Sequence, residues 1–289
     1  MPGVFSRLIP TIATAFGVEA FFAAIFVPQQ NETYYDLCGS IGWASSALAS
    51  LYYPALKAKY WDAVPNAVIP ALSSFAPRQL LLSAALGIWT ARLGYFLAER
   101  AIRHGGDSRF DKIKKKPTTF TIYWLMQSVW ITTVGLPVFL VNVVPKVAHP
   151  PLGPRDYIGL GLLASSFLFE VVADRQKTEW RRAKNNKQHD EQFITSGLWS
   201  VSRHPNYLGE IGTWAGIYTL ASSSLQTVVY PGGTLALAAI SPLFLYGLLR
   251  YGSGVPPLER NGDKKYGSNP KWQEYKKNVP IFWPWGSTK

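Results

Sequence analysis

The chain has 289 residues, of which 48% are hydrophobic and only 16% charged, a composition too poor in charge for an ordinary soluble protein. A single cysteine, Cys38, excludes an internal disulfide framework and a cysteine-rich metal cluster, and the 4 histidines are not at close ligand spacing, so we expect no metal site. The net charge of +12 is compatible with nucleic-acid binding, but membrane topology explains it better.

Long uncharged segments predict membrane-spanning helices. A helix needs about 20 apolar residues to cross a bilayer core of about 30 Å. Residues 37–56, 117–145 and 211–249 contain no Asp, Glu, Lys or Arg, and the turn residues at 231–233 divide the last stretch into two helices. The predicted spans are 8–27, 34–53, 80–97, 120–144, 157–173, 205–225 and 233–251. We therefore predict an all-α polytopic membrane protein of about seven transmembrane helices, with residues 1–289 forming a single integral membrane domain.

The basic residues predict how these spans are oriented. Most of the 29 lysines and arginines lie in segments 100–116 and 175–203 and in the tail from residue 250, which share one side of the membrane if the spans number seven. Because positively charged loops stay in the cytosol, the C-terminus is expected there and the N-terminus on the opposite side. The same asymmetry accounts for the basic charge without nucleic acid, so the partners expected are membrane lipids.

Ionisable side chains within the apolar segments are functional candidates, because burying them in the membrane costs free energy. Glu170, Asp174, Lys177 and Arg181 are spaced by four, three and four residues, so they form one stripe along the fifth predicted helix. A simpler interpretation is a ladder of charges that solvates the helix end, but Glu170 lies a full turn inside the apolar segment.

The sequence SRHPNYLGE predicts a polar start for the sixth helix. Pro205 suits a first helical turn, and the N-terminal N–H groups beside Arg203 and His204 would attract phosphate. Asn206 and Glu210 share a face one turn deeper. The glycines that follow form a small-residue stripe, for which close helix packing is the favoured role: Gly209, Gly212 and Gly216.

The third predicted helix carries Arg92 inside an apolar segment, followed by Tyr95 and Glu99. Arg92 is not expected to face lipid, and two interpretations stay open. It either contributes to a polar site, or it reaches toward the membrane surface or pairs with Glu99.

Several motifs together resemble a known family. SRHPNYLGE preceded by SGLW, with FEVVADRQK, ARLGYFLAER, GGDSRF and SGVPPLE, resembles the steroid 5-alpha-reductase C-terminal-domain superfamily, most closely the branch called domain of unknown function 1295. The resemblance covers roughly residues 85–285. It implies an NADPH-dependent membrane reductase that reduces a C=C bond, in an enone or related alkene, of a steroid-like or other lipid substrate. It also implies a cytosol-facing cofactor cavity and a location in the endoplasmic reticulum.

The resemblance also assigns site residues. It implies substrate contacts from Trp89 and Tyr123, and a membrane acid with a tyrosine partner as the catalytic pair, for which Glu19, Asp36 and Tyr95 are the candidates. The cofactor-binding residues that it implies are Arg92, Glu170, Asp174, Arg181, Arg203, His204, Asn206, Tyr207 and Glu210.

Two other functions stay open at this point. Isoprenylcysteine carboxyl methyltransferases have a related fold and an Arg-His-Pro-x-Tyr element but bind S-adenosylmethionine, and they usually carry paired glutamates where this tail has Leu258-Glu259-Arg260. A non-catalytic sterol or lipid binder could also retain the fold. No obligate protein partner is predicted for any of the three functions.

Overall fold

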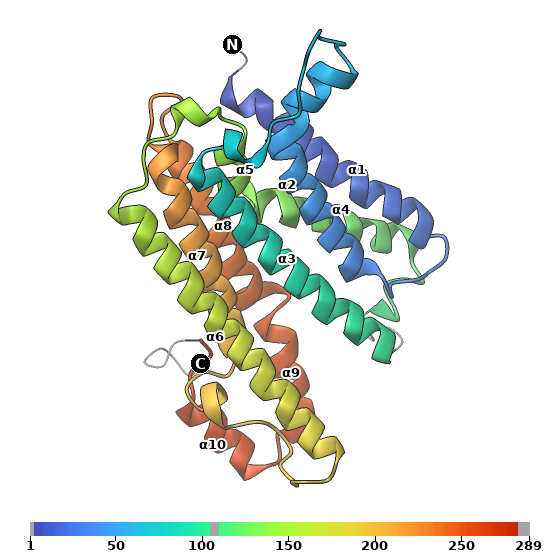
Figure 1. Cartoon of the computed structure of the whole chain (residues 1–289). Coiled ribbons are helices and arrows are strands. Elements are labelled where there is room, and N and C mark those ends of the chain that lie inside the picture. Colours follow the sequence, from blue (N-terminus) through green and yellow to red (C-terminus); the bar gives the residue numbers. More distant parts are fainter. Residues whose placement is uncertain (1–2, 105–109, 283–289) are drawn as a thin grey trace. The chain divides into compact units, whose positions relative to one another are not determined.

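The computed structural model describes residues 3–104 and 110–282, with the side chains of residues 96–104 left out (Figure 1). These residues form helices joined by loops, and no strand occurs among them, which confirms the all-α prediction for this part of the chain. The principal helices are α1 (Ile9–Phe26), α2 (Tyr35–Tyr60), α3 (Pro77–His104), α4 (Pro117–Val134), α5 (Leu136–Asn142), α6 (Pro154–Asn185), α7 (Pro205–Leu225), α8 (Thr234–Gly247), α9 (Val255–Tyr266) and α10 (Pro270–Asn278).

Each of the seven predicted spans coincides with helix, and α7 has the predicted bounds. Within the described residues, three helical runs are long and apolar enough to cross a membrane, namely Val4–Phe26, Pro154–Asn185 and Thr234–Tyr266. The pair α4 and α5 makes a fourth if it is counted as one bent span. The chain therefore has the helices of a membrane protein, while seven crossings stay a prediction.

The fourth predicted span is not continuous. It is broken between α4 and α5, which are bent by 59°. Pro137 has no N–H to donate to the preceding turn, and its ring crowds that turn. Gly135 allows a close approach to the end of α4, because an added Cβ there would lie 2.8 Å from the Ile131 carbonyl oxygen. The break at the end of α4 and the end of α5 itself leave helical carbonyl groups for other donors. Ser241 Oγ donates to the Val134 carbonyl at 2.6 Å, and Tyr230 Oη donates to that of Leu140 at 3.0 Å.

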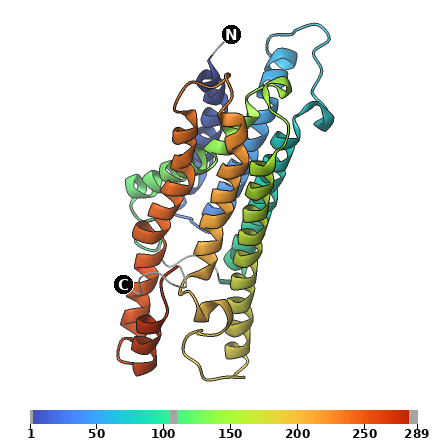
Figure 2. The same ribbon diagram turned by 90° about the vertical axis from the view of Figure 1, so that its left-hand side faces the viewer.

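The described chain divides into two compact units. The first comprises Met1–Asp156 with Leu220–Ser241, and the second comprises Tyr157–Thr219 with Pro242–Lys289. Figure 2 gives a second view of the helices that make up each unit.

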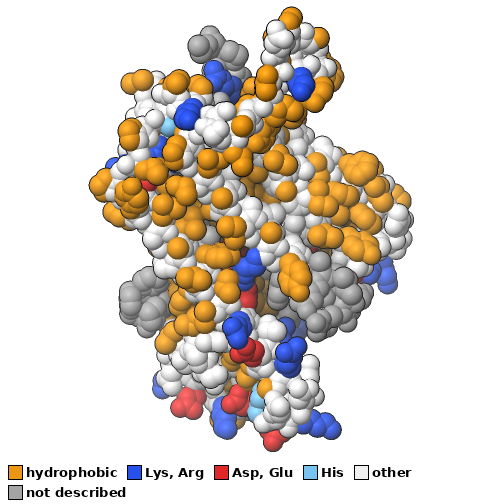
Figure 3. All heavy atoms as spheres, viewed as in Figure 1, with side chains coloured by type: hydrophobic (Ala, Val, Ile, Leu, Met, Phe, Trp, Pro, Cys, Tyr) orange, Lys and Arg blue, Asp and Glu red, His pale blue; other side chains and the backbone are white. Residues whose placement is uncertain are grey.

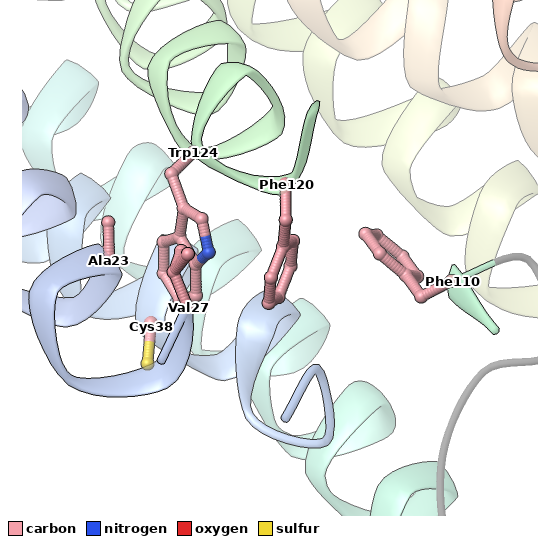
Figure 4. Packing of buried hydrophobic residues seen from close by; sticks show 6 residues of the cluster. All are labelled: Ala23, Val27, Cys38, Phe110, Phe120 and Trp124. Carbon is pink, nitrogen blue, oxygen red and sulfur yellow. The ribbon is translucent and has the colours of Figure 1, made fainter. Parts of the chain in front are cut away.

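In the first unit, α1 and α2 pack along faces of small and polar residues. The buried residues of α1 recur every four positions: Thr11, Ala15, Glu19 and Ala23. At the end of α1 an aromatic and aliphatic cluster fills the space between α1, α2 and α4 (Figure 4). In it, the ring of Trp124 stacks on Phe26 with centroids 6.2 Å apart and meets Tyr35 edge-on at 4.9 Å.

A buried ion pair fixes the start of α3 in the same unit. The Arg78 guanidinium donates to both carboxylate oxygens of Asp156 at 2.7 and 2.8 Å, and each side chain is 1% exposed. Arg78 also donates to Ser224 Oγ at 2.8 Å, and Ser224 is hydrogen-bonded to His149 Nδ1 at 2.8 Å. Charges buried together in this way are stabilised by each other, so removing one partner is costly.

In the second unit, α6 and α7 approach each other along the predicted glycine stripe. A Cβ added at Gly209 would lie 2.7 Å from the backbone nitrogen of Glu170, and one at Gly216 would lie 2.5 Å from that of Leu163. Gly212 packs on Ser166 in the same way. Only glycine allows two helix backbones to come so close, which confirms the packing role predicted for the stripe.

We predict that Gly216→Ala destabilises the protein by about 1–3 kcal/mol, because the new methyl group meets backbone that cannot rotate away. The matched control is Gly161→Ala on α6, where the added Cβ has nothing within 4 Å. It should be neutral or stabilise the protein by up to about 1 kcal/mol through helix propensity. Thermal unfolding of both variants in the same detergent tests this, and equal midpoints would contradict the packing described.

We also predict that acid weakens the first unit through His149. Burial, and secondarily the Arg78 charge, lower the pKa of His149 below its ordinary value of 6.5, despite its hydrogen bond to the Val144 carbonyl. Because the unfolded chain then binds the proton more readily, the free energy of unfolding is unaffected above the ordinary pKa and falls as the pH drops below it. The melting temperature of His149→Gln should depend less on pH over that range than that of the wild type. An unchanged pH slope would exclude His149 as the cause.

Candidate functional site

The predicted polar stripe belongs to the second unit and runs from the middle of α6 to its C-terminal end. Glu170 is 6% exposed and faces Gly209 of α7, whereas Arg181 lies in the exposed last turns of the helix. Figure 3 shows charged side chains gathered at this end of the unit. The stripe therefore runs from a buried acid to an exposed guanidinium, as its spacing predicts.

The segment SGLW folds back over this end of α6. Gly197 has a φ of +60°, and Gln176 fills the space where a side chain would project, so glycine is required there. Gln176 Oε1 accepts the N–H of Leu198 at 2.9 Å, and Trp199 Nε1 donates to the Ala173 carbonyl at 3.0 Å. The Lys177 ammonium lies 4.2 Å from the centroid of the Trp199 indole, a cation–π contact. These contacts hold the segment that leads into α7.

The residues just before α7 are bound to the C-terminal tail. The backbone N–H groups of Arg203 and His204 donate to the carbonyls of Pro280 and Ile281 at 2.9 and 3.1 Å. The Arg203 guanidinium donates to the carbonyls of Lys276 and Val279, each at 2.8 Å, and to Glu259 Oε1 at 3.1 Å. Arg203 is thus a link between the start of α7 and the tail.

Glu259, on α9, joins the two residues that precede α7. Its Oε1 accepts from His204 Nε2 at 2.9 Å as well as from Arg203, and Lys276 lies 3.6 Å from Oε2. Burial lowers the pKa of His204, and the hydrogen bond to Glu259 opposes that shift. His204 Nδ1 is buried and has no hydrogen-bond partner in the described part of the chain. A neutral imidazole that donates from Nε2 therefore keeps Nδ1 as a buried acceptor.

The tail itself is ordered by aromatic packing. A buried cluster is formed by Trp272 and Tyr275 of α10 and by Val279, which follows that helix, and Phe193 packs against it. Tyr275 Oη donates to the Trp199 carbonyl at 2.7 Å, and burial raises the pKa of Tyr275. The tail, the SGLW segment and the start of α7 are therefore one connected structure.

A cavity of about 610 Å³ lies between the loop after α6 and helix α10. Three carboxylates and a single lysine contribute to its wall, so its charge does not favour a polyphosphate. The lining residues are Asp190, Glu191, Gln192, Phe193, Thr195, Asn269, Lys271, Glu274, Tyr275, Asn278 and Val279.

The predicted cofactor residues other than Arg92 belong to the second unit, where they lie on α6, just before α7 or in its first two turns, and their cofactor roles stay predictions: Glu170, Asp174, Arg181, Arg203, His204, Asn206, Tyr207 and Glu210. The ring of Tyr207 stacks on that of His204, with centroids 5.8 Å apart and planes 12° apart. The remaining predicted residues belong to the first unit, and their roles stay predictions: Arg92, Trp89, Tyr95, Glu19, Asp36 and Tyr123.

These residues of the first unit differ in burial. Trp89 is 1% exposed and meets Trp43 edge-on at 5.4 Å, while Tyr95 is 74% exposed and Tyr123 is 39% exposed. Glu19 is buried, and Asp36 is partly buried in the first turn of α2. Of the GGDSRF motif only Phe110 lies within the described residues.

Sequence reasoning missed the partners of the buried charges. It did not predict that Glu259 joins Arg203 to His204, that Gln127 meets Glu19, or that Arg78 pairs with Asp156. A signal existed for Gln127 and Arg78, because both are strongly polar residues beside or within apolar segments. Their partners are far away in the sequence, so only the fold identifies them.

An all-helical membrane protein with a polar cluster where two helices meet an ordered tail is the class of protein that these features define. Its sequence matches the family described as Protein of unknown function (DUF1295) over residues 58–279, and the chain belongs to that family. It is also 26% identical over 180 residues to the uncharacterized protein C594.04c of Schizosaccharomyces pombe, in a match that covers 53% of this chain and 52% of that protein. The chain thus spans about half the length of this relative. No solved structure matches it.

We predict that Glu259→Ala destabilises the second unit by about 3 kcal/mol, because it leaves the buried Arg203 guanidinium without its carboxylate. Glu274→Ala is the matched control, since Glu274 is an exposed glutamate on the neighbouring helix α10. Thermal unfolding and the rate of proteolysis within the tail measure the effect. If both variants behave as the wild type does, Glu259 does not hold the tail.

Proposed function

We propose that this protein is an NADPH-dependent membrane oxidoreductase that reduces a C=C bond of a steroid-like or other lipid substrate. The observation that carries the proposal is the polar cluster of the second unit, defined as the buried Glu170 against Gly209 of α7, the buried imidazole acceptor of His204 just before α7, and the cations Lys177 and Arg181 further along α6. Membership in the DUF1295 family, which is related to the steroid reductases, supports the same activity.

The residues of this cluster fit a dinucleotide by their chemistry. Phosphate groups need cations and N–H donors. The cations of the cluster are Arg181 and Lys177, and the first turn of α7 has the N–H groups. Amide and hydroxyl donors of the cofactor need acceptors, for which we propose Asp174, Glu210 and His204 Nδ1. Arg203 has three of its contacts on the tail, so its proposed role is to fix the site.

In such a reaction the bound dinucleotide supplies the hydride. The contribution of this chain is then to bind and orient. The acceptors on α6 and α7 would fix the cofactor, and the close α6–α7 packing would exclude water from the buried end at Glu170. A lipid substrate would arrive from the membrane, because its apolar body is most stable there.

The first test is thermal stabilisation of the detergent-purified protein by NADPH, NADH or S-adenosylmethionine. A ligand at 100 times its dissociation constant adds about 2.7 kcal/mol to the free energy of unfolding. We expect a rise in melting temperature with NADPH. A rise with S-adenosylmethionine alone would favour a methyltransferase instead, and no rise with any of them would favour a non-catalytic lipid binder.

A second prediction concerns the phosphate contact. Arg181→Ala should weaken NADPH binding by about tenfold or more, since a hydrogen bond to a charged group contributes about 1.5–3 kcal/mol. Arg182→Ala is the matched control, because Arg182 is an exposed arginine on the adjacent face of the same helix. Binding measured by calorimetry should distinguish the two variants, and equal affinities would remove Arg181 from the site.

A further inference from the structure

Glu19 is an acid buried in the first unit, with 1% of its surface exposed. Gln127 Nε2 donates to its Oε2 at 3.1 Å, while Oε1 has no hydrogen-bond partner within the described ranges. Oε1 lies against Gly42, where an added Cβ would be 2.6 Å away. Since both neighbours are uncharged and a bare carboxylate is very costly in such surroundings, we infer that Glu19 is an uncharged carboxylic acid.

Hydroxyl groups without partners continue from Glu19 along the buried faces of two helices. On α2, Ser46 follows Gly42 by one turn, is fully buried and has no hydrogen-bond partner among the described residues. On α1, Thr11 precedes Glu19 by two turns on the same face. It is also buried and has no hydrogen-bond partner among the described residues. Because consecutive helices α1 and α2 run side by side in opposite directions, both hydroxyls lie on the same side of Glu19 (Figure 1).

A polar network lies one turn beyond Ser46. Asn142 Nδ2 donates to Ser50 Oγ at 2.9 Å and to Ser83 Oγ at 3.0 Å, and Asn142 Oδ1 is buried without a partner in the described chain. Buried polar atoms in proteins are almost always hydrogen-bonded, to protein or to ordered water. Successive unpaired hydroxyl and amide groups are therefore the lining expected of a file of internal water.

The other side of Glu19 is closed by apolar groups. Ala23, one turn beyond Glu19 on α1, and Val27, which follows the helix, enter the aromatic and aliphatic cluster with Phe120 and Trp124 (Figure 4). Trp124 Nε1 in this cluster is buried and has no partner within the described residues, but it is a single donor, whereas an ordered internal water makes about two to four hydrogen bonds. Access by water is therefore expected from the side on which α1 begins.

We propose that Glu19 is a proton-binding site that exchanges its proton with water along a row of buried polar side chains. This row, called the lane below, consists of Ser46, Ser50, Thr11 and Asn142. The proton leaves the carboxylic acid to a lane water, and a proton from the aqueous phase replaces it, so charge and atoms balance. In the predicted orientation this phase lies opposite the cytosol. Reduction of a C=C bond consumes one proton with each hydride, and a role of Glu19 in supplying it rests on the proposed function, whereas the exchange does not.

Infrared difference spectroscopy of the full-length protein in lipid tests the exchange without substrate or cofactor. At neutral pH we expect a protonated-carboxyl carbonyl band that disappears in Glu19→Gln. In the wild type this band should shift promptly on transfer to D₂O. In Ser46→Val the shift should be at least about tenfold slower, because exchange then waits for local opening of the helices.

Matched controls separate the lane from general effects of substitution. Ser45→Val changes the adjacent serine, which is only half-buried, and should exchange like the wild type. If Ser46→Val does not fold, Thr11→Val is compared with Thr14→Val, since Thr14 already donates to the Pro10 carbonyl at 2.8 Å. A carboxyl band that persists in Glu19→Gln, or equal exchange in lane and control variants, would overturn the proposal. Failure of NADPH to bind would leave it unaffected.

Discussion

The second unit depends on one carboxylate. Glu259 receives hydrogen bonds from Arg203 and His204, and through them it fixes the direction in which the chain enters α7. Arg203 in turn holds the tail through two main-chain carbonyls, so tail and helix are positioned together. The Arg203 guanidinium is 3% exposed, and a charge buried to this extent is stable only while its partners stay in place. The geometry of the candidate site is therefore set by the tail as much as by the helices that carry the site residues.

Close backbone contact is the second constraint. The glycine stripe of α7 brings that helix against α6, so that Glu170 faces the Gly209 backbone. Side chains at the glycine positions would separate the helices and the two halves of the polar cluster with them. The close approach of α6 and α7 therefore depends on the absence of side chains at the glycine positions, as is common for helix pairs in membranes.

Much of this arrangement was predictable from the sequence, for a physical reason. Apolar length and charge interruption identify helices locally, and the rule that proline suits a first turn located the start of α7 at Pro205. The break at Pro137 was missed because an uncharged stretch looks continuous by hydropathy alone. The partners of Arg203, Glu19 and Arg78 were also missed, since a pair separated by many residues leaves no periodic signal. Helical register, being local, is legible in the sequence, whereas the pairing of distant charges requires the fold.

The ends of α4 and α5 constrain which sequence changes this part of the chain can accept. The last turn of α4 offers the Val134 carbonyl to Ser241, and the last turn of α5 offers the Leu140 carbonyl to Tyr230, so distant segments are hydrogen-bonded to main chain. A carbonyl exists whatever residue bears it, so substitutions at Val134 and Leu140 preserve these attachment points. Inserting or deleting one residue would rotate the carbonyls away from both hydroxyls. These attachments therefore constrain the length of this part of the chain, whereas packing constrains its buried side chains, such as Val134, Val138 and Leu140.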